Sequence, residues 1–137
     1  MTLDELEQVL RDVADELEGE DGRWQIRLGE VALACMTDLR FDRMRLIAPI
    51  AELDEVNEEL RNACLEANFH TALDARYATS DGVLYAAFIH PLSPLDADQA
   101  ESAVQQVANL VETFGTTFSS GALVFGVPPR GQGGEMN

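Results

Sequence analysis

The pattern at the start of the chain is that of an amphipathic helix. Thr2 and Glu5 have the spacing of a capping box, in which each side chain satisfies a backbone N–H at the helix start. Apolar residues then recur on one helical face: Leu3, Leu6, Val9, Leu10, Val13 and Leu17. Gly19 and Gly22 follow this stripe, so we expect a helix that ends there.

Alternating apolar and polar positions after Gly22 predict three strands. Arg23–Leu28 and Val31–Met36 are separated by two residues, Gly29-Glu30, and a glycine in the first position suits a type II′ hairpin turn. Met44–Ala51 alternates in the same way and should form the third strand. Because Pro49 has no N–H, this strand must be an edge strand or contain a bulge.

The second half of the chain predicts a helix, a hairpin and a last helix. Asp54 is a candidate N-cap for the first of these helices, whose apolar stripe is narrow and ends in small residues: Val56, Leu60, Ala63, Cys64 and Ala67. Small residues permit close approach, so this helix either packs on the sheet or meets the same helix of a second copy. Asp74–Thr79 and Val83–His90 form the hairpin, and the last helix begins near Asp96 and stops at Gly115.

The hairpin strand Val83–His90 is apolar on both faces and therefore needs two covers. The last helix supplies one, and a second subunit is a candidate for the other. We expect one domain over residues 1–115 and a C-terminal extension over 116–137. Within the extension, Ala122–Val127 is a candidate edge strand, and the polar, glycine-rich end that follows is expected to be disordered.

Charge and cysteine content narrow the classes of function. The 137 residues include 25 acidic and 9 basic side chains, giving a formal charge of -16, which repels phosphate backbones and anionic lipid. We therefore expect neither nucleic-acid binding nor membrane insertion, and the chain has no apolar run of about 18 residues. Cys35 and Cys64 lie in apolar stretches without a CxxC partner, which fits a reducing cytoplasm.

The predicted order of helix, three strands, helix, two strands and helix resembles the class I type III secretion chaperones, the Tir-chaperone or CesT-like family, and the related YbjN-like group. The match spans roughly Leu3 to Phe114. It implies an α+β fold with an antiparallel sheet packed against helices. Three segments carry the resemblance: Leu65-Glu66-Ala67-Asn68-Phe69, Leu73–Ala78 with Asp81-Gly82-Val83-Leu84, and Pro91-Leu92-Ser93-Pro94-Leu95-Asp96.

The resemblance implies a cytoplasmic homodimer without cofactor or catalysis. Such a chaperone binds the extended N-terminal region of a secreted effector and keeps it soluble and competent for secretion. If the chain belongs with the YbjN-like group instead, it is a protein-interaction module of the same fold without a role in secretion. The residues expected to bind the client are Leu6, Leu10, Trp24, Ile26, Leu33 and Met36. Those expected at the dimer interface are Val56, Leu60, Ala63, Tyr85 and Ala87.

Catalytic and metal sites are weakly indicated. His70 lies near Asp74 in the sequence and His90 near Ser93, but the chain has no HxxxH or HxH spacing. Ser119-Ser120-Gly121 lacks the Gly-x-Ser-x-Gly frame of a nucleophile elbow. We therefore expect no enzyme activity, no catalytic residue and no metal.

A cluster of arginines separates the second and third predicted strands. Arg40, Arg43 and Arg45 are interspersed with Asp38 and Asp42. The favoured interpretation is a set of solvated ion pairs, because these are common on protein surfaces. The alternative is an anion-binding patch for a carboxylate of a client or of a second protomer, since isolated arginines form no basic stripe for nucleic acid.

Overall fold

A computed structural model describes residues 1–115 of the chain, so the candidate strand Ala122–Val127 and the rest of the extension lie outside the described residues. One short 3-10 helix, η1, follows the fourth strand. The elements in chain order are α1 (Leu3–Val13), β1 (Glu16–Glu20), β2 (Arg23–Leu28), β3 (Val31–Asp38), β4 (Arg43–Glu52), η1 (Leu53–Glu55), α2 (Glu58–His70), β5 (Arg76–Ser80), β6 (Val83–Pro91) and α3 (Ala97–Thr113).

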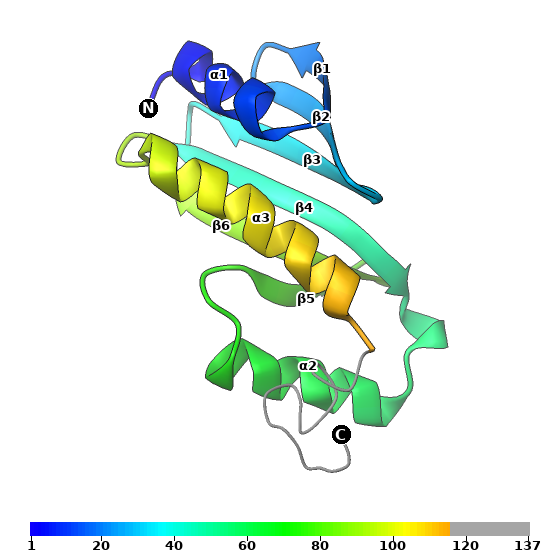
Figure 1. Cartoon of the computed structure of the whole chain (residues 1–137). Helices are drawn as coiled ribbons and strands as arrows, with labels where there is room; N and C mark the ends of the chain where they lie inside the picture. Colours follow the sequence, from blue (N-terminus) through cyan, green and yellow to red (C-terminus); the bar gives the residue numbers. More distant parts are fainter. Residues whose placement is uncertain (116–137) are drawn as a thin grey trace.

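The six strands form one sheet in the order β1-β2-β3-β4-β6-β5, and all neighbours are antiparallel. Figure 1 shows α1 and α3 lying across the same face of the sheet, with α2 beyond β5. The predicted α+β class is confirmed, and β1 and β5 are the two edges. This sheet has one strand more than the sequence pattern predicted.

The extra strand, β1, replaces the end of the predicted first helix. The helix stops at Val13, and β1 pairs with β2 so that Leu17 lies opposite Ile26. Leu17 fitted the helical stripe, but it equally fits the alternation of a strand whose other side chains are glutamates. Gly19 is required here because its φ is +125° and a Cβ would lie 2.2 Å from the Arg23 carbonyl oxygen. The prediction that Gly19 ends the helix is therefore wrong.

The predicted capping box and bulge are present, whereas the predicted N-cap of the second helix is wrong. The capping box of Thr2 is present, and α3 begins with a second one at Asp96. The N-cap of α2 is Asn57, whose side chain accepts from the Leu60 N–H, while Asp54 belongs to η1. Pro49 lies in the interior strand β4, where the register shifts, so the bulge alternative is confirmed.

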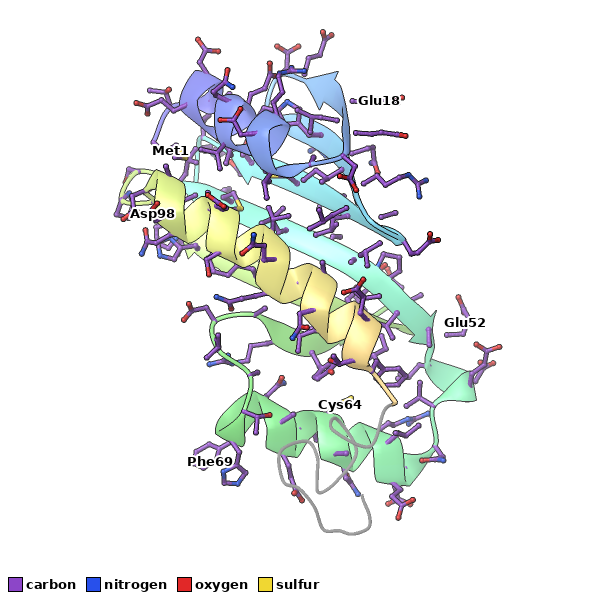
Figure 2. All side chains as sticks on the ribbon, in the orientation of Figure 1. Met1, Glu18, Glu52, Cys64, Phe69 and Asp98 are labelled. Atoms are coloured by element: carbon purple, nitrogen blue, oxygen red, sulfur yellow. The ribbon has the colours of Figure 1, made fainter. Side chains whose placement is uncertain are left out.

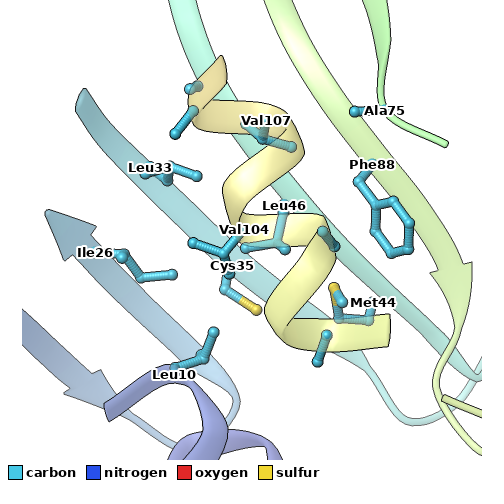
Figure 3. Packing of buried hydrophobic residues seen from close by; sticks show 14 of the residues in the cluster. Leu10, Ile26, Leu33, Cys35, Met44, Leu46, Ala75, Phe88, Val104 and Val107 are labelled. Carbon is cyan, nitrogen blue, oxygen red and sulfur yellow. The ribbon is translucent and has the colours of Figure 1, made fainter. Parts of the chain in front are cut away.

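The main core fills the space between the sheet and the two helices α1 and α3, as Figure 3 shows. A second cluster joins α2 to the end of the sheet and contains Val56, Cys64, Ala67, Tyr77 and Leu84. Both cysteines are free, and burial raises the pKa of each thiol to about 12. The thiols therefore stay protonated and behave as small apolar side chains.

Candidate protein-binding surface

The two faces of the sheet differ in what covers them. In β4 the side chains of Met44, Leu46 and Ala48 are fully buried beneath the helices, while the residues between them point to the other side. No helix within residues 1–115 covers that other side, because α1, α2 and α3 all pack into the clusters on the first side. We call the uncovered side the open face.

Apolar side chains form a strip across the open face. Ala34 of β3 lies opposite Ile47 of β4, which lies opposite Ala87 of β6. Residues opposite each other in a ladder point to the same face, so these three side chains adjoin. Four more apolar residues extend the strip: Met36, Pro49, Tyr85 and Ile89. Ile89 is 56% exposed. The strip offers apolar surface that an extended peptide can bury.

A hollow of about 500 Å³ lies at one end of the strip, where the β3–β4 turn begins. Met36 and Phe41 give it apolar walls, and Phe41 is 64% exposed. The other residues that line it are Arg23, Thr37, Asp38, Arg43 and Arg45. The hollow therefore combines apolar and cationic groups on a chain whose net charge is strongly negative.

The expected ion pairs in the arginine cluster do not form among the described residues, where the ion pairs are Arg11 with Glu7 and Arg27 with Glu16. The two aspartates of the cluster accept hydrogen bonds from uncharged groups instead. Asp38 accepts from the Phe41 N–H. Asp42 accepts from the backbone N–H and the hydroxyl of Ser93, which lowers the pKa of its carboxyl.

A second apolar feature lies on α2. Leu65, Phe69 and Leu73 are 67%, 84% and 70% exposed, and their spacing of four residues places the two helical ones on one side. We call these three residues the α2 ridge. Figure 2 shows Phe69 and Cys64 pointing to opposite sides of α2, Cys64 toward the sheet and Phe69 away from it. Leu65 and Phe69 therefore lie on the side of α2 away from the second core cluster, whereas Leu73 lines a hollow with Ala67 and Tyr77 of that cluster.

Asn68 closes part of the free edge of β5. Its amide nitrogen donates to the Tyr77 carbonyl at 3.0 Å, and its amide oxygen accepts from the Tyr77 N–H at 2.8 Å. The side chain thus satisfies the two backbone groups of Tyr77 as a neighbouring strand would. Asn68 lies in one of the three segments that carry the family resemblance, but the sequence alone predicts no role for it. The feature that could have indicated a role is an asparagine near the end of a helix, where its poor helix propensity favours a residue with another function.

The residues expected to bind a client lie mostly beneath the helices. Leu6, Leu10, Trp24, Ile26 and Leu33 are at most 3% exposed and belong to the main core. Trp24 also donates from Nε1 to Glu7 at 2.8 Å, which is the main cause that lowers the pKa of that carboxyl. Met36 is the one member of the set that faces the open side. In the described chain, the accessible apolar surface on the sheet is therefore on the opposite face from five of the six.

The residues expected at a dimer interface do not share one surface. Val56 is buried in the second core cluster, against which Leu60 and Ala63 pack. Tyr85 and Ala87 lie on the open face, with partial exposure. The structure therefore separates the three residues in and just before α2 from the two in β6.

Groups suited to catalysis do not converge in the described part of the chain. His70 is exposed at the end of α2, edge-on to Phe69, while His90 stacks on Phe88 and places Nδ1 2.7 Å from the Pro91 carbonyl oxygen. Within residues 1–115 no group of three or more His, Cys, Asp or Glu side chains is placed to hold a metal. Ser119-Ser120-Gly121 lies outside that part. None of the described helices is both long and apolar enough to span a membrane.

Comparisons with known proteins give matches in structure and none in sequence. No protein-family model matches the chain, and no curated protein matches its sequence. A chain of the HopA1–SchA chaperone–effector complex aligns with a TM-score of 0.63 and 14% identity, over 81% of this chain and 90% of that one. The type III secretion chaperone SycH of Yersinia pestis, in complex with a fragment of YscM2, aligns with a TM-score of 0.60 and 14% identity, over 81% and 97%.

The similar structures also include a member of the YbjN-like group, which the sequence resembles as well. YbjN of E. coli aligns with a TM-score of 0.57 and 13% identity, over 82% of this chain and 91% of YbjN. At such identities the likeness concerns the fold alone. Residues 1–115 thus have the α+β fold found in type III secretion chaperones and in YbjN.

Proposed function

We propose that this chain is a cytoplasmic chaperone of type III secretion, which binds the extended N-terminal region of a secreted effector and keeps it soluble and competent for secretion. The observation that carries the proposal is the apolar strip on the open face, which no described element covers. The fold supports it, because the similar structures include a chaperone–effector complex and a secretion chaperone with a bound fragment.

The strip suits an extended client for a simple geometric reason. Alternate side chains of an extended segment point the same way, so several of them can lie on the strip together. Burying an aliphatic or aromatic side chain contributes about 1.5–3 kcal/mol, so a few such contacts offset the cost of ordering the segment. Holding a client in this way needs no nucleotide, cofactor or metal. The net charge of -16 disfavours the aggregation of unloaded dimers through their exposed strips.

The α2 ridge suits self-association. Its three large apolar side chains are more exposed than any on the open face, and α2 directs Leu65 and Phe69 away from the second core cluster. In the proposed homodimer the ridges of two copies meet across a two-fold axis. Leu60 and Ala63 lie on the same helix and pack against the second core cluster beneath the interface. Tyr85 and Ala87 then belong to the client surface, and Val56 stabilises each protomer from within.

A second candidate function is a protein-interaction module outside secretion, favoured by the structural likeness to YbjN. The same strip and ridge serve this function, but the bound partner is then not a secreted protein. The identity of the partner therefore separates the two functions, and the surface that holds it does not.

The test is native mass spectrometry of the untagged chain isolated from its own cells. We expect a mass of twice the 15.0 kDa chain plus one polypeptide. Peptide mapping after limited proteolysis should find the N-terminal region of that polypeptide protected, and the polypeptide should be one that the cells secrete. A partner that is not secreted supports the second function, and a bare chain contradicts both.

The matched variants are Ile47→Asp on the strip and Gln105→Asp on the exposed side of α3. Each adds one negative charge at a surface position, so they change net charge equally. Loss of the client from Ile47→Asp with retention by Gln105→Asp supports the open face. Equal retention by both variants contradicts the strip as the binding surface.

A further inference from the structure

Two arginines beside the hollow on the open face have no partner among residues 1–115. Arg23 of β2 and Arg45 of β4 lie on either side of Met36 of β3, as the register of the three strands requires. Both side chains are exposed, and neither has a hydrogen bond or ion pair with a described residue. Adjacent strands are about 4.8 Å apart, so the backbones of the two arginines are about 10 Å apart.

The other described arginines are engaged. Arg11 and Arg27 pair with glutamates. Arg40 lies over the Phe41 ring, with Cζ 5.3 Å from the ring centroid. The remaining three bond to backbone carbonyls: Arg43, Arg61 and Arg76. Although the chain has 25 acidic side chains, two arginines at the same hollow are thus unpaired within its described part.

The surroundings of the pair combine an apolar floor with positive charge. Met36 lies between the two arginines, exposed Phe41 forms a wall, and Arg43 adds a third cation. Asp38 also lines the hollow and repels an anion, but its carboxylate already accepts from the Phe41 N–H at 3.1 Å. This arrangement of apolar and cationic side chains favours a ligand that has an apolar centre and a negative charge on either side.

We propose that this hollow binds an acidic segment of another protein, in which one aromatic or aliphatic side chain lies between two carboxylates. The carboxylates stand two positions before and after the apolar residue, because alternate side chains of an extended chain point the same way. The apolar side chain contacts Met36 and Phe41, while Arg23 and Arg45 each pair with a carboxylate. The inference rests on the proposed function and names the chemistry that a client must present.

Charge argues for this occupant over other anions. Nucleic acid approaches a chain of net charge -16 against long-range repulsion, and two arginines form no stripe along a phosphate backbone. A peptide carries few charges, so two local ion pairs can outweigh that repulsion. Its central side chain also uses the apolar floor, which a phosphate would leave uncovered.

The experiment measures binding of fluorescein-labelled ten-residue peptides by anisotropy. The probe contains Glu-x-Phe-x-Glu, and two control peptides contain Lys-x-Phe-x-Lys and Glu-x-Ser-x-Glu. We expect the probe to bind about tenfold more tightly than either control, and to weaken as NaCl is raised, because both ion pairs are exposed to solvent. Equal binding of the lysine peptide, or displacement of the probe by a short oligonucleotide at equal charge, overturns the proposal.

The variants are Arg23→Gln/Arg45→Gln and, as a control of equal charge change, Arg11→Gln/Arg27→Gln. Affinity for the probe should fall about tenfold in the first and less than twofold in the second, since only the first removes the two ion pairs with the peptide, while the second removes ion pairs within the chain. Equal affinities overturn the proposal. Dissociation of the chain's own dimer by the first variant also overturns it, because the occupant is then a second copy.

Failure of this inference is distinguishable from failure of the proposed function. If Arg23→Gln/Arg45→Gln retains the natural client and the probe does not bind, the function stands and the acidic-segment inference falls. If no client is isolated from cells but the probe binds through the two arginines, the hollow is an acidic-peptide site and the secretion role falls.

Discussion

The covered and open faces of the sheet are built from the same strands, yet they differ in burial and in the groups that they present. Leu46 and Ile47 are neighbours in β4, but Leu46 is fully buried beneath α3 and Ile47 lies on the apolar strip of the open face. The covered face holds the fold together, and the open face presents apolar surface and unpaired arginines. An apolar residue in an alternating strand therefore belongs to the core or to the surface, depending on which face of the sheet the helices occupy.

The largest expected difference is between aspartate substitutions at these two neighbours. Leu46→Asp buries a charge without a partner and should lower the free energy of unfolding by about 4 kcal/mol or more. Ile47→Asp leaves its charge in contact with water and should cost about 1 kcal/mol or less. Urea unfolding followed by circular dichroism measures both. Equal losses would show that the open face is covered in the folded protein.

The closure of the β5 edge by Asn68 should have a smaller effect on stability. Asn68→Ala removes both bonds to Tyr77 and should cost about 2 kcal/mol, because two partly buried backbone groups lose their partner. Asn62→Ala, on the exposed side of α2, is the control for helix propensity. Hydrogen exchange at the Tyr77 amide should accelerate in the first variant alone. Unchanged exchange would mean that the amide is protected by another group.

The α2 ridge should affect association and leave stability unchanged. Phe69→Ser removes a side chain that is 84% exposed, so the urea midpoint should stay the same at protein concentrations where the chain is monomeric. In the proposed dimer the change removes apolar contact and should weaken self-association about tenfold. Sedimentation velocity over a dilution series measures it, with Leu39→Ser as a control at another exposed apolar position. Equal effects of the two variants would place the dimer interface elsewhere.

The smallest expected effect is on stability in acid and involves Asp42, at the turn beside the hollow. The Ser93 hydroxyl and N–H lower the pKa of Asp42 in the folded state, so its contribution is present above the unfolded pKa, near 3.8, and is lost as pH falls below it. Asp42→Asn should therefore lose less stability than the wild type between pH 7 and pH 3. Thermal unfolding at both pH values measures the difference.

Asp21→Asn is the matched control for that titration. Asp21 has nearly the same backbone conformation, with a φ of 56° against 54° for Asp42, and it makes no hydrogen bond from its side chain to a described residue. Its acid sensitivity should therefore parallel that of the wild type. If both asparagine variants behave alike, the Ser93 contacts do not hold the pKa of Asp42 down.

Most elements of the fold follow from local patterns, and the errors arise where two patterns coincide. Leu17 continues a helical stripe and also alternates with glutamates, so the sequence did not distinguish the end of α1 from β1. Asp54 and Asn57 are both good N-caps, and the choice of Asn57 depends on the turn of η1 before it. Residues 16–20 form a strand because they pair with β2, and such a contact between separate elements is not visible in the local sequence pattern.

The proposed binding surface is harder to predict from the sequence than the fold. The stripe of Leu6 and Leu10 indicates an apolar face, but not whether a client or the chain's own sheet covers it, and here the sheet does. The arginine cluster was recognisable from sequence only in part. Arg23 belongs to the same hollow because β2 pairs with β3 in a register that places Arg23 beside Met36. In the sequence, Arg23 is far from the other arginines of the cluster, so their proximity could not be recognised there.

The central claim is that the open face, and not the helical layer, contacts the client. The most direct test places a photo-crosslinking benzoylphenylalanine at Ile89 on the strip or at Glu101 on the exposed side of α3, and irradiates the chain in its own cells. We expect an adduct with the client from position 89 and none from position 101. An adduct from position 101 alone, or equal adducts from both, would contradict the account.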